Sequence, residues 1–246
     1  MKRRDLLLAS LALLAVWELA SLLVNQQILP SPLKVARVFV EEMGHGLGGH
    51  FLASLWRVVA STALAIALAS PAGLVLGQSK RLNAWFSPVI YLLYPIPKVV
   101  LVPVVLLFLG IGDLPKIAII FLILFFQILV LVRDQAASIR PELIQSVRSL
   151  GAGRRALFRF VYFPASLPAI LTALRQSLGT SVAVLYVAES FATQRGLGYY
   201  ISFNGGTRLN YPAMYAGIVA MSLLGLGLYF AVDWLESRLT PWLFAN

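Results

Sequence analysis

The residues of this sequence best placed for chemistry are polar side chains that lie inside long apolar stretches. Charge is costly in a hydrocarbon environment, so the charged groups found there commonly line a solute path or pair with one another. The sequence predicts a set of candidates for lining such a path: Lys98, Arg175, Ser177, Ser181 and Glu189. Their chemistry would be binding or gating of a solute.

Lys98 follows Tyr94-Pro95-Ile96-Pro97, where the two prolines bend a helix and free backbone carbonyls. Broken helices and buried charges often mark solute pathways, which makes Lys98 a candidate gate residue. A lysine paired with Glu18, or one that reaches an interface, is an equally good interpretation. Both interpretations stay open.

The other candidates also have structural interpretations. Arg175 favours an ion pair near one end of its helix, and the small residues Ser177 and Ser181 slightly favour close helix packing over a hydrated path. Glu189 precedes the glycine-bearing segment 195–200, and it favours an interfacial carboxylate over a gate or a protein contact.

The side-chain sets typical of enzymes are missing from the sequence. It contains no cysteine, and His45 and His50 lie in a glycine-rich segment without a nucleophile pattern. The Gly-x4-Gly-Lys-Ser/Thr phosphate loop does not occur either. We therefore expect no catalytic residue, no metal site and no bound cofactor, and energy from a separate subunit or an ion gradient.

Composition indicates which elements position these side chains. Of the 246 residues, 59% are hydrophobic and 12% are charged, whereas soluble domains average about 25% charged residues. Several apolar runs reach the roughly 20 residues that cross a bilayer, and the alternation typical of a β-barrel is absent. The sequence predicts an all-α, polytopic membrane bundle. The net charge of +10 is spread between the apolar runs, which argues against nucleic acid.

A single membrane domain over residues 1–246 with six spans is predicted. The spans run approximately over 6–24, 55–76, 89–109, 114–132, 167–188 and 213–235. Residues 33–43 are too polar to span and predict an interfacial helix that ends in a run of glycines. Most basic residues outside the spans fall on one side if both termini are cytoplasmic, which also makes the loop 133–165 cytoplasmic.

That long loop predicts two short helices. Pro141 and Glu142 are typical of a first helical turn, and Leu143, Val147 and Leu150 form an apolar stripe before Gly151. A second helix is expected from Arg154 to Tyr162, ending at Pro164. From these patterns alone, a basic amphipathic helix lying on anionic headgroups is about as good an interpretation as a docking element.

The spacing within the loop resembles the EAA loop of binding-protein-dependent ABC permeases, whose pattern is Glu-Ala-Ala-x3-Gly-x9-Ile-x-Leu-Pro. Here Gln145-Ser146-Val147 stands for Glu-Ala-Ala, Gly151 for the glycine, and Val161-x-Phe163-Pro164 for the ending. Further strings in the expected order, such as Leu29-Pro30-Ser31-Pro32 and Gly196-Leu197-Gly198, are similar to the nitrate, sulfonate and taurine branch of these permeases.

The resemblance implies a type I ABC importer permease whose loop docks on a separate ATPase that holds ATP and Mg. The docking residues it implies are Leu143, Gln145, Val147, Arg148, Leu150, Gly151, Arg154, Leu157 and Pro164. It also implies a homodimer in the bacterial inner membrane, surrounded by lipid and supplied by a periplasmic or lipid-anchored binding protein. The implied solute is a small anion, such as a sulfonate, nitrate or taurine, or a vitamin-precursor heterocycle.

Two other classes of protein fit the residues without the resemblance. An ion-coupled secondary transporter or channel would use Glu18, Lys98 and Glu189 as coupling residues, but the sequence shows no convincing internal repeat. A membrane enzyme or assembly factor would use the basic loop only to hold lipid.

Overall fold

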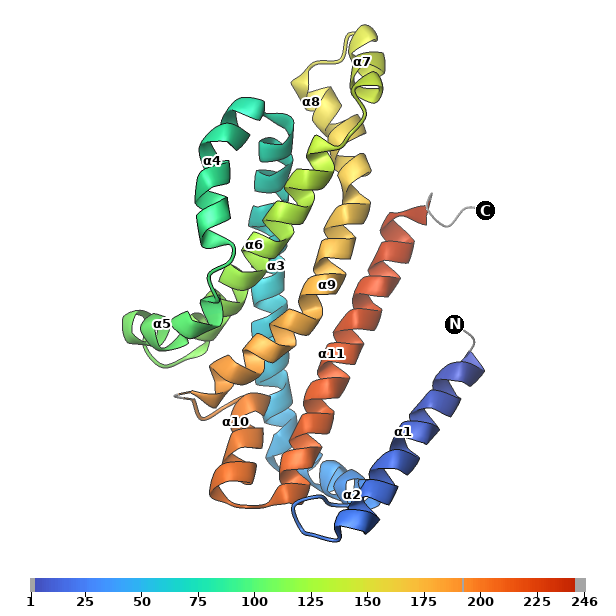
Figure 1. Cartoon of the computed structure of the whole chain (residues 1–246), viewed down its shortest axis with the longest axis vertical. Coiled ribbons are helices and arrows are strands. Elements are labelled where there is room, and N and C mark those ends of the chain that lie inside the picture. The colour runs from blue at the N-terminus through green and yellow to red at the C-terminus, as the bar shows by residue number, and fades with distance from the viewer. Residues whose placement is uncertain (1–2, 192, 242–246) are drawn as a thin grey trace. The chain divides into compact units, whose positions relative to one another are not determined.

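The computed structural model describes residues 3–191 and 193–241, and every regular element in this part of the chain is a helix. Figure 1 shows the helices in chain order. The predicted all-α class is confirmed. Within these described residues, five helices are long and apolar enough to cross a membrane, or six when one bent pair counts as a span. The unbent long helices are α1 (Arg3–Val24), α3 (Gly48–Gln78), α6 (Asp113–Ala137), α9 (Phe163–Ser190) and α11 (Tyr211–Leu239).

The bent pair replaces the single span predicted over 89–109. α4 (Lys80–Leu93) is followed by a one-turn 3₁₀ helix, Lys98–Leu101, and then by α5 (Val102–Leu109), with a bend of 75° between the two halves. Figure 1 shows α4 and α5 as separate helices that meet at this break. Pro95 and Pro97 lie at the break and lack the amide hydrogens that a continuous helix needs.

Three more local predictions differ from the structure. The glycine-rich segment after residue 43 is a π-helical turn, Met43–Leu47, that leads directly into α3 at Gly48. The predicted connection over 77–88 is mostly helical, because the Ser79 side chain caps α4 and Pro88 is accommodated inside it. The second loop helix does not end at Pro164, because the π-helical turn Phe158–Tyr162 continues directly into α9, whose second residue is Pro164.

The chain forms two compact units, described here one at a time. The first unit comprises the residues up to Leu55 together with Glu189–Leu224. It contains α1, α2 (Pro32–Glu42), α10 (Leu197–Ser202) and the π-helical turn Phe203–Thr207. Trp17 and Ser21 of α1 donate hydrogen bonds to the carbonyls of Pro30 and Leu29, at 3.1 and 2.9 Å. These bonds hold the turn between α1 and α2 against α1.

The second unit comprises Trp56–Ala188 together with the chain from Gly225 onward. Its helices α3 and α6 approach closely at two glycines one helical turn apart. A Cβ atom at Gly73 would lie 2.9 Å from the Leu129 carbonyl oxygen, and one at Gly77 would lie 2.5 Å from the Arg133 oxygen. A further cluster joins α9 and α11 to α3 through Leu174, Leu178, Leu228, Val232 and Ile66.

Candidate functional site

The loop between α6 and α9 consists of short helical segments joined by brief connections. It comprises α7 (Pro141–Ser149), α8 (Arg154–Leu157) and a π-helical turn, Phe158–Tyr162, that runs directly into α9. Figure 1 shows α7 and α8 beyond the ends of α6 and α9, which they connect. Gly151 follows α7 with a φ of 82°, and its amide donates to the Arg148 carbonyl at 2.9 Å. The left-handed backbone at Gly151 is what turns the chain back after α7.

The apolar residues of α7 divide between two faces. Ile144 and Val147 pack on a small core formed by Leu157, Val161 and Tyr162. Leu143 and Leu150 instead point away from that core, with 52% and 84% of their surface exposed. Leu157, which is 3% exposed, has no free surface for a partner. The apolar stripe predicted for Leu143, Val147 and Leu150 is therefore divided. Val147 packs with Leu157 inside the loop, whereas Leu143 and Leu150 remain exposed.

The remaining docking candidates lie mostly on the open side of the loop. Gln145, Arg148 and Gly151 are exposed, whereas Pro164 is half-buried within α9. The side chain of Arg154 lies outside the described part of the structure. Exposed arginine beside exposed leucine makes this end of the second unit both basic and apolar, which suits a groove with an acidic rim.

Lys98 closes the break between α4 and α5. Its ammonium group donates hydrogen bonds to the carbonyls of Leu93, Tyr94 and Ile96 at 2.9, 3.0 and 3.3 Å. It also lies 4.7 Å from the centre of the Phe126 ring. The side chain thus satisfies backbone groups that the break leaves without helical partners.

A cavity of about 300 Å³ lies beside Lys98 within the second unit. Its lining mixes apolar side chains with polar ones, among them Gln127 of α6 and Thr180 of α9. The Gln127 side-chain oxygen is buried and has no hydrogen-bond partner among the described residues. This cavity is the place where the structure brings a sequence candidate together with polar groups able to receive a small solute.

Arg175 forms the ion pair that its sequence position favours. Its guanidinium group pairs with Asp233 at 2.6 Å and with Glu236, both on α11. Ser177 and Ser181 are buried, and their hydroxyls donate to the carbonyls of Ala173 and Leu178 in the same helix. Within this chain, all three residues have structural partners.

Glu189 lies at the centre of a buried network in the first unit. Its carboxylate, which is 0% exposed, accepts hydrogen bonds from the Ser54 hydroxyl and from the Gly198 amide. The Ser54 hydroxyl in turn accepts the Leu197 amide at 2.8 Å, and His50 Nδ1 accepts the Gly196 amide at 3.0 Å. The interfacial carboxylate favoured by the sequence is instead a buried group that organises the segment before α10.

Two residues of this network, Ser54 and His50, are not recognisable from the sequence, because nothing in their spacing links them to residues more than 130 positions away. Beside the network, Tyr200 donates to Glu42 at 3.2 Å. Burial of the phenol and the nearby Glu42 carboxylate both raise the pKa of Tyr200, so the tyrosine stays neutral.

A second ion pair, Arg57 with Asp113, is also missing from the sequence-based candidates. Arg57 is 3% exposed and contacts one Asp113 oxygen through Nε at 2.8 Å and Nη2 at 2.6 Å. The sequence did contain a signal for this pair, because an arginine inside an apolar stretch is expected to have an acidic or polar partner. Asp113 opens α6, where the helix dipole also favours a carboxylate.

Comparison with known proteins gives consistent results over most of the chain. The model of a family described as "Binding-protein-dependent transport system inner membrane component" matches residues 52–241. The taurine transport system permease protein TauC of Escherichia coli is 31% identical over 92% of this chain and 84% of its own length. The formylaminopyrimidine transport permease protein ThiX of Halalkalibacterium halodurans is 29% identical over 94% and 93%.

Among solved structures, an inward-facing structure of the MetNI methionine ABC transporter contains a similar chain. The TM-score is 0.71 at 21% identity, and the match covers 81% of this chain and 99% of the other. At this identity the likeness concerns the fold.

Proposed function

Because this chain belongs to the family of binding-protein-dependent transport system inner membrane components, we propose that it forms a solute path and is driven by a separate ATPase docked on its 133–165 loop. It is a multi-pass membrane protein and a permease subunit of an ABC importer. In the proposed assembly two copies form the pore, and the partner ATPase supplies the ATP and Mg chemistry.

The observation that carries the docking proposal is the division of α7 into two faces. Ile144 and Val147 fix the helix to Leu157 and its neighbours, while Leu143 in its first turn and Leu150 just after its end are left exposed. Exposed leucines can enter an apolar groove on a partner, and the packed face of α7 keeps the helix folded when the partner moves. Movement of the ATPase would then reach α6 and α9 as rigid-body motion.

For the solute path, we propose the cavity beside Lys98. The broken span leaves polar backbone there, and Gln127 and Thr180 add side-chain groups. Ser177, Ser181 and Arg175 support the helices of the second unit by the hydrogen bonds and ion pairs described above, and Glu189 supports the first unit. The relatives that carry the names of taurine and formylaminopyrimidine permeases support a small solute, an anion or a vitamin-precursor heterocycle.

Sidedness follows from the basic residues of the sequence. We propose that the 133–165 loop and both termini face the cytoplasm, and that a binding protein delivers the solute at the opposite face. The setting proposed for the assembly is the bacterial inner membrane.

The test of the docking proposal is co-purification of the ATPase from detergent-solubilised membranes. The native chain is compared with a Leu150→Glu, Gly151→Asp double variant, and Leu33→Glu serves as control because Leu33 of α2 is also an exposed leucine, at 74%. We expect the native chain and the control to retain the ATPase and the double variant to lose it. Retention by all three would overturn the docking site, and recovery of transport by the chain without any ATPase would overturn the mechanism.

A further inference from the structure

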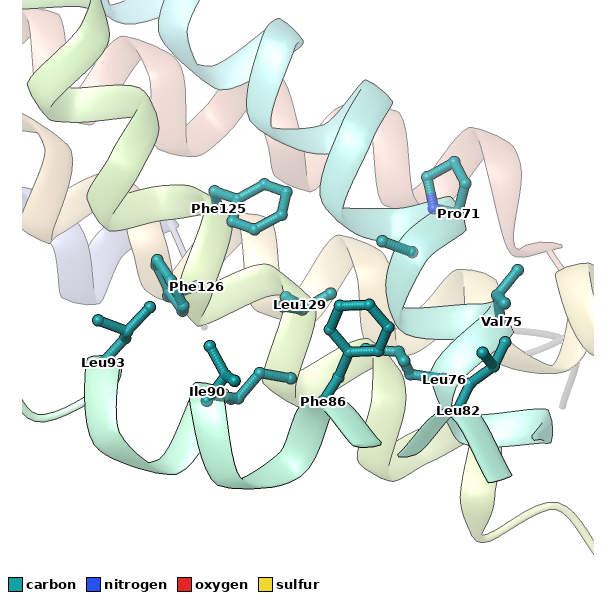
Figure 2. A pocket seen from close by; sticks show the side chains of 12 residues that line it. Pro71, Val75, Leu76, Leu82, Phe86, Ile90, Leu93, Phe125, Phe126 and Leu129 are labelled. Carbon is teal, nitrogen blue, oxygen red and sulfur yellow. The ribbon is translucent and has the colours of Figure 1, made fainter. Parts of the chain in front are cut away.

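An apolar cavity of about 510 Å³ lies in the second unit, next to the Lys98 cavity, with which it shares the lining residue Phe126. It is bounded by three helices: Pro71, Val75 and Leu76 belong to α3, Leu82, Phe86, Ile90 and Leu93 to α4, and Phe125, Phe126 and Leu129 to α6. Figure 2 shows the α4 side chains facing those of α3 and α6 across it. Its volume falls in the range of about 300–1,000 Å³ typical of ligand pockets.

Several side chains around this cavity remain uncovered. Phe86 is 52% exposed and Val75 is 47% exposed, although both lie in helices of a membrane-spanning unit. All twelve lining residues are apolar, so no hydrogen-bonding ligand part fits inside. The interior therefore suits a hydrocarbon group.

The depth of the cavity corresponds to one leaflet. From Leu82 to Leu93 the rise of an α-helix amounts to about 16 Å, which is close to half of the roughly 30 Å hydrocarbon core. At Leu93 the helix ends and the chain bends by 75°. A hydrocarbon chain that enters at the Leu82 end would thus reach the closed end of the cavity, at the bend after Leu93, at about the bilayer midplane.

Cationic side chains stand at the Leu82 end. Lys80 and Arg81 open α4, are exposed, and make no ion pair or side-chain hydrogen bond with any residue that the structure describes. Trp85 follows one turn later and is 74% exposed, as expected for a residue at the headgroup level. Exposed cations beside an apolar cavity match an anionic headgroup joined to an acyl chain.

We propose that this cavity binds an anionic phospholipid, with one acyl chain between α3, α4 and α6 and the headgroup at Lys80 and Arg81. A helix about 10 Å wide over the same 16 Å would need roughly 1,300 Å³, more than the about 990 Å³ of all empty space between these side chains, including its open part. An acyl chain is the slimmer occupant. The apolar lining cannot distinguish one lipid tail from another, because all tails are about as apolar as leucine. Selection among lipids therefore depends on the charge of the headgroup.

The test uses the full chain in bilayers that contain a phospholipid with a photoreactive acyl chain. Phosphatidylglycerol and phosphatidylcholine with identical chains are compared, and labelled peptides are quantified by mass spectrometry at sub-saturating lipid. We expect phosphatidylglycerol to label peptides 71–93 strongly. In a Lys80→Gln, Arg81→Gln variant that labelling should fall by roughly thirtyfold, the factor for two cations near an anionic surface.

Lys34→Gln with Arg37→Gln is the matched control, since these are exposed basic residues of α2 in the first unit. It should leave the labelling unchanged. A second variant, Ala72→Phe, fills the cavity and should lower labelling by both lipids. Equal labelling of the native chain by the two lipids, or undiminished labelling of Ala72→Phe, would overturn the proposal. None of these readings requires an ATPase, so the result is independent of the transport mechanism.

Discussion

The hydroxyl group of Ser54 lies 2.8 Å from each carboxylate oxygen of Glu189, and both residues are completely buried. These residues are 135 positions apart, and their contact fixes the start of α3 to the end of α9 within the first unit. The same hydroxyl accepts the Leu197 amide, so one small side chain serves two backbone segments.

Replacement of Ser54 by alanine should destabilise the chain. The change leaves the Leu197 amide without its acceptor and removes a donor from a buried carboxylate, which costs about 1–3 kcal/mol. The free energy of unfolding, measured by denaturant titration in mixed micelles, tests this. Ser222→Ala is the control, because Ser222 is exposed and bonds only to Ile218 of its own helix; it should change the value by less than about 0.5 kcal/mol. Equal effects of both changes would contradict the prediction.

The two carboxylates that contact Arg175 should differ in importance. The side chain of Asp233 is 58% exposed and that of Glu236 is 10% exposed, so water replaces the first partner more easily than the second. We expect Asp233→Asn to cost about 0–1 kcal/mol and Glu236→Gln to cost more. Thermal unfolding of the two variants in the same detergent gives the comparison. A larger loss from Asp233→Asn would show that the assignment is wrong.

Gly151 should be sensitive to alanine for a backbone reason alone. Its φ of 82° disfavours any residue with a Cβ, although no atom lies within 4 Å of where that Cβ would stand. Gly151→Ala should cost about 1–2 kcal/mol and speed hydrogen exchange in α7. Gly153 has equal space without the positive φ, so Gly153→Ala is the matched control and should leave exchange unchanged. Similar exchange in the two variants would exclude a left-handed Gly151.

Gly77 should be sensitive to alanine for a steric reason. A Cβ there would lie 2.5 Å from the Arg133 oxygen and 2.6 Å from the Ala136 Cβ, which forces α3 and α6 apart. Overpacking of this kind typically costs about 1–3 kcal/mol. Gly179, with nothing within 4 Å, provides the control. We expect a lower thermal midpoint for Gly77→Ala and none of that loss for Gly179→Ala; the reverse order would contradict the close approach.

Lys98 should be required for the stability of the broken span. Lys98→Met leaves the carbonyls of Leu93, Tyr94 and Ile96 without their charged donor, and such a bond contributes about 1.5–3 kcal/mol. Lys98→Arg retains donors and should recover most of the stability. The two variants are compared by unfolding and by transport in the assembled complex. Normal stability of Lys98→Met would show that the carbonyl contacts are dispensable.

Much of the fold is predictable because long apolar runs have few alternatives in a bilayer. The helical class and the bend at Pro95 and Pro97 follow from rules that act over neighbouring residues. The start of α4 does not, because Pro88 and the polar residues near Lys80 resemble a loop until the Ser79 cap is recognised. Helix starts depend on single side chains, and hydropathy averages over them.

The candidate residues were less predictable than the helices. Val147 and Leu157 have the same character as Leu143 and Leu150, and only the packing of α7 on α8 separates braced from exposed. Ser54 carries no sequence signal, since its partners are distant in the chain. The glycine pair Gly73 and Gly77 did carry one, because small residues four apart commonly mark close helix contacts in membranes.

The connections at the two ends of the 133–165 loop determine how far α7 can move independently of α6 and α9. Three residues separate the end of α6 from Pro141, and the chain from Phe158 enters α9 without interruption. Gly151 and Gly153 lie between α7 and α8, but the packing of Ile144 and Val147 on the core of Leu157, Val161 and Tyr162 braces this connection. A displacement of α7 by a docked partner would therefore be passed to α6 and α9 with little local bending.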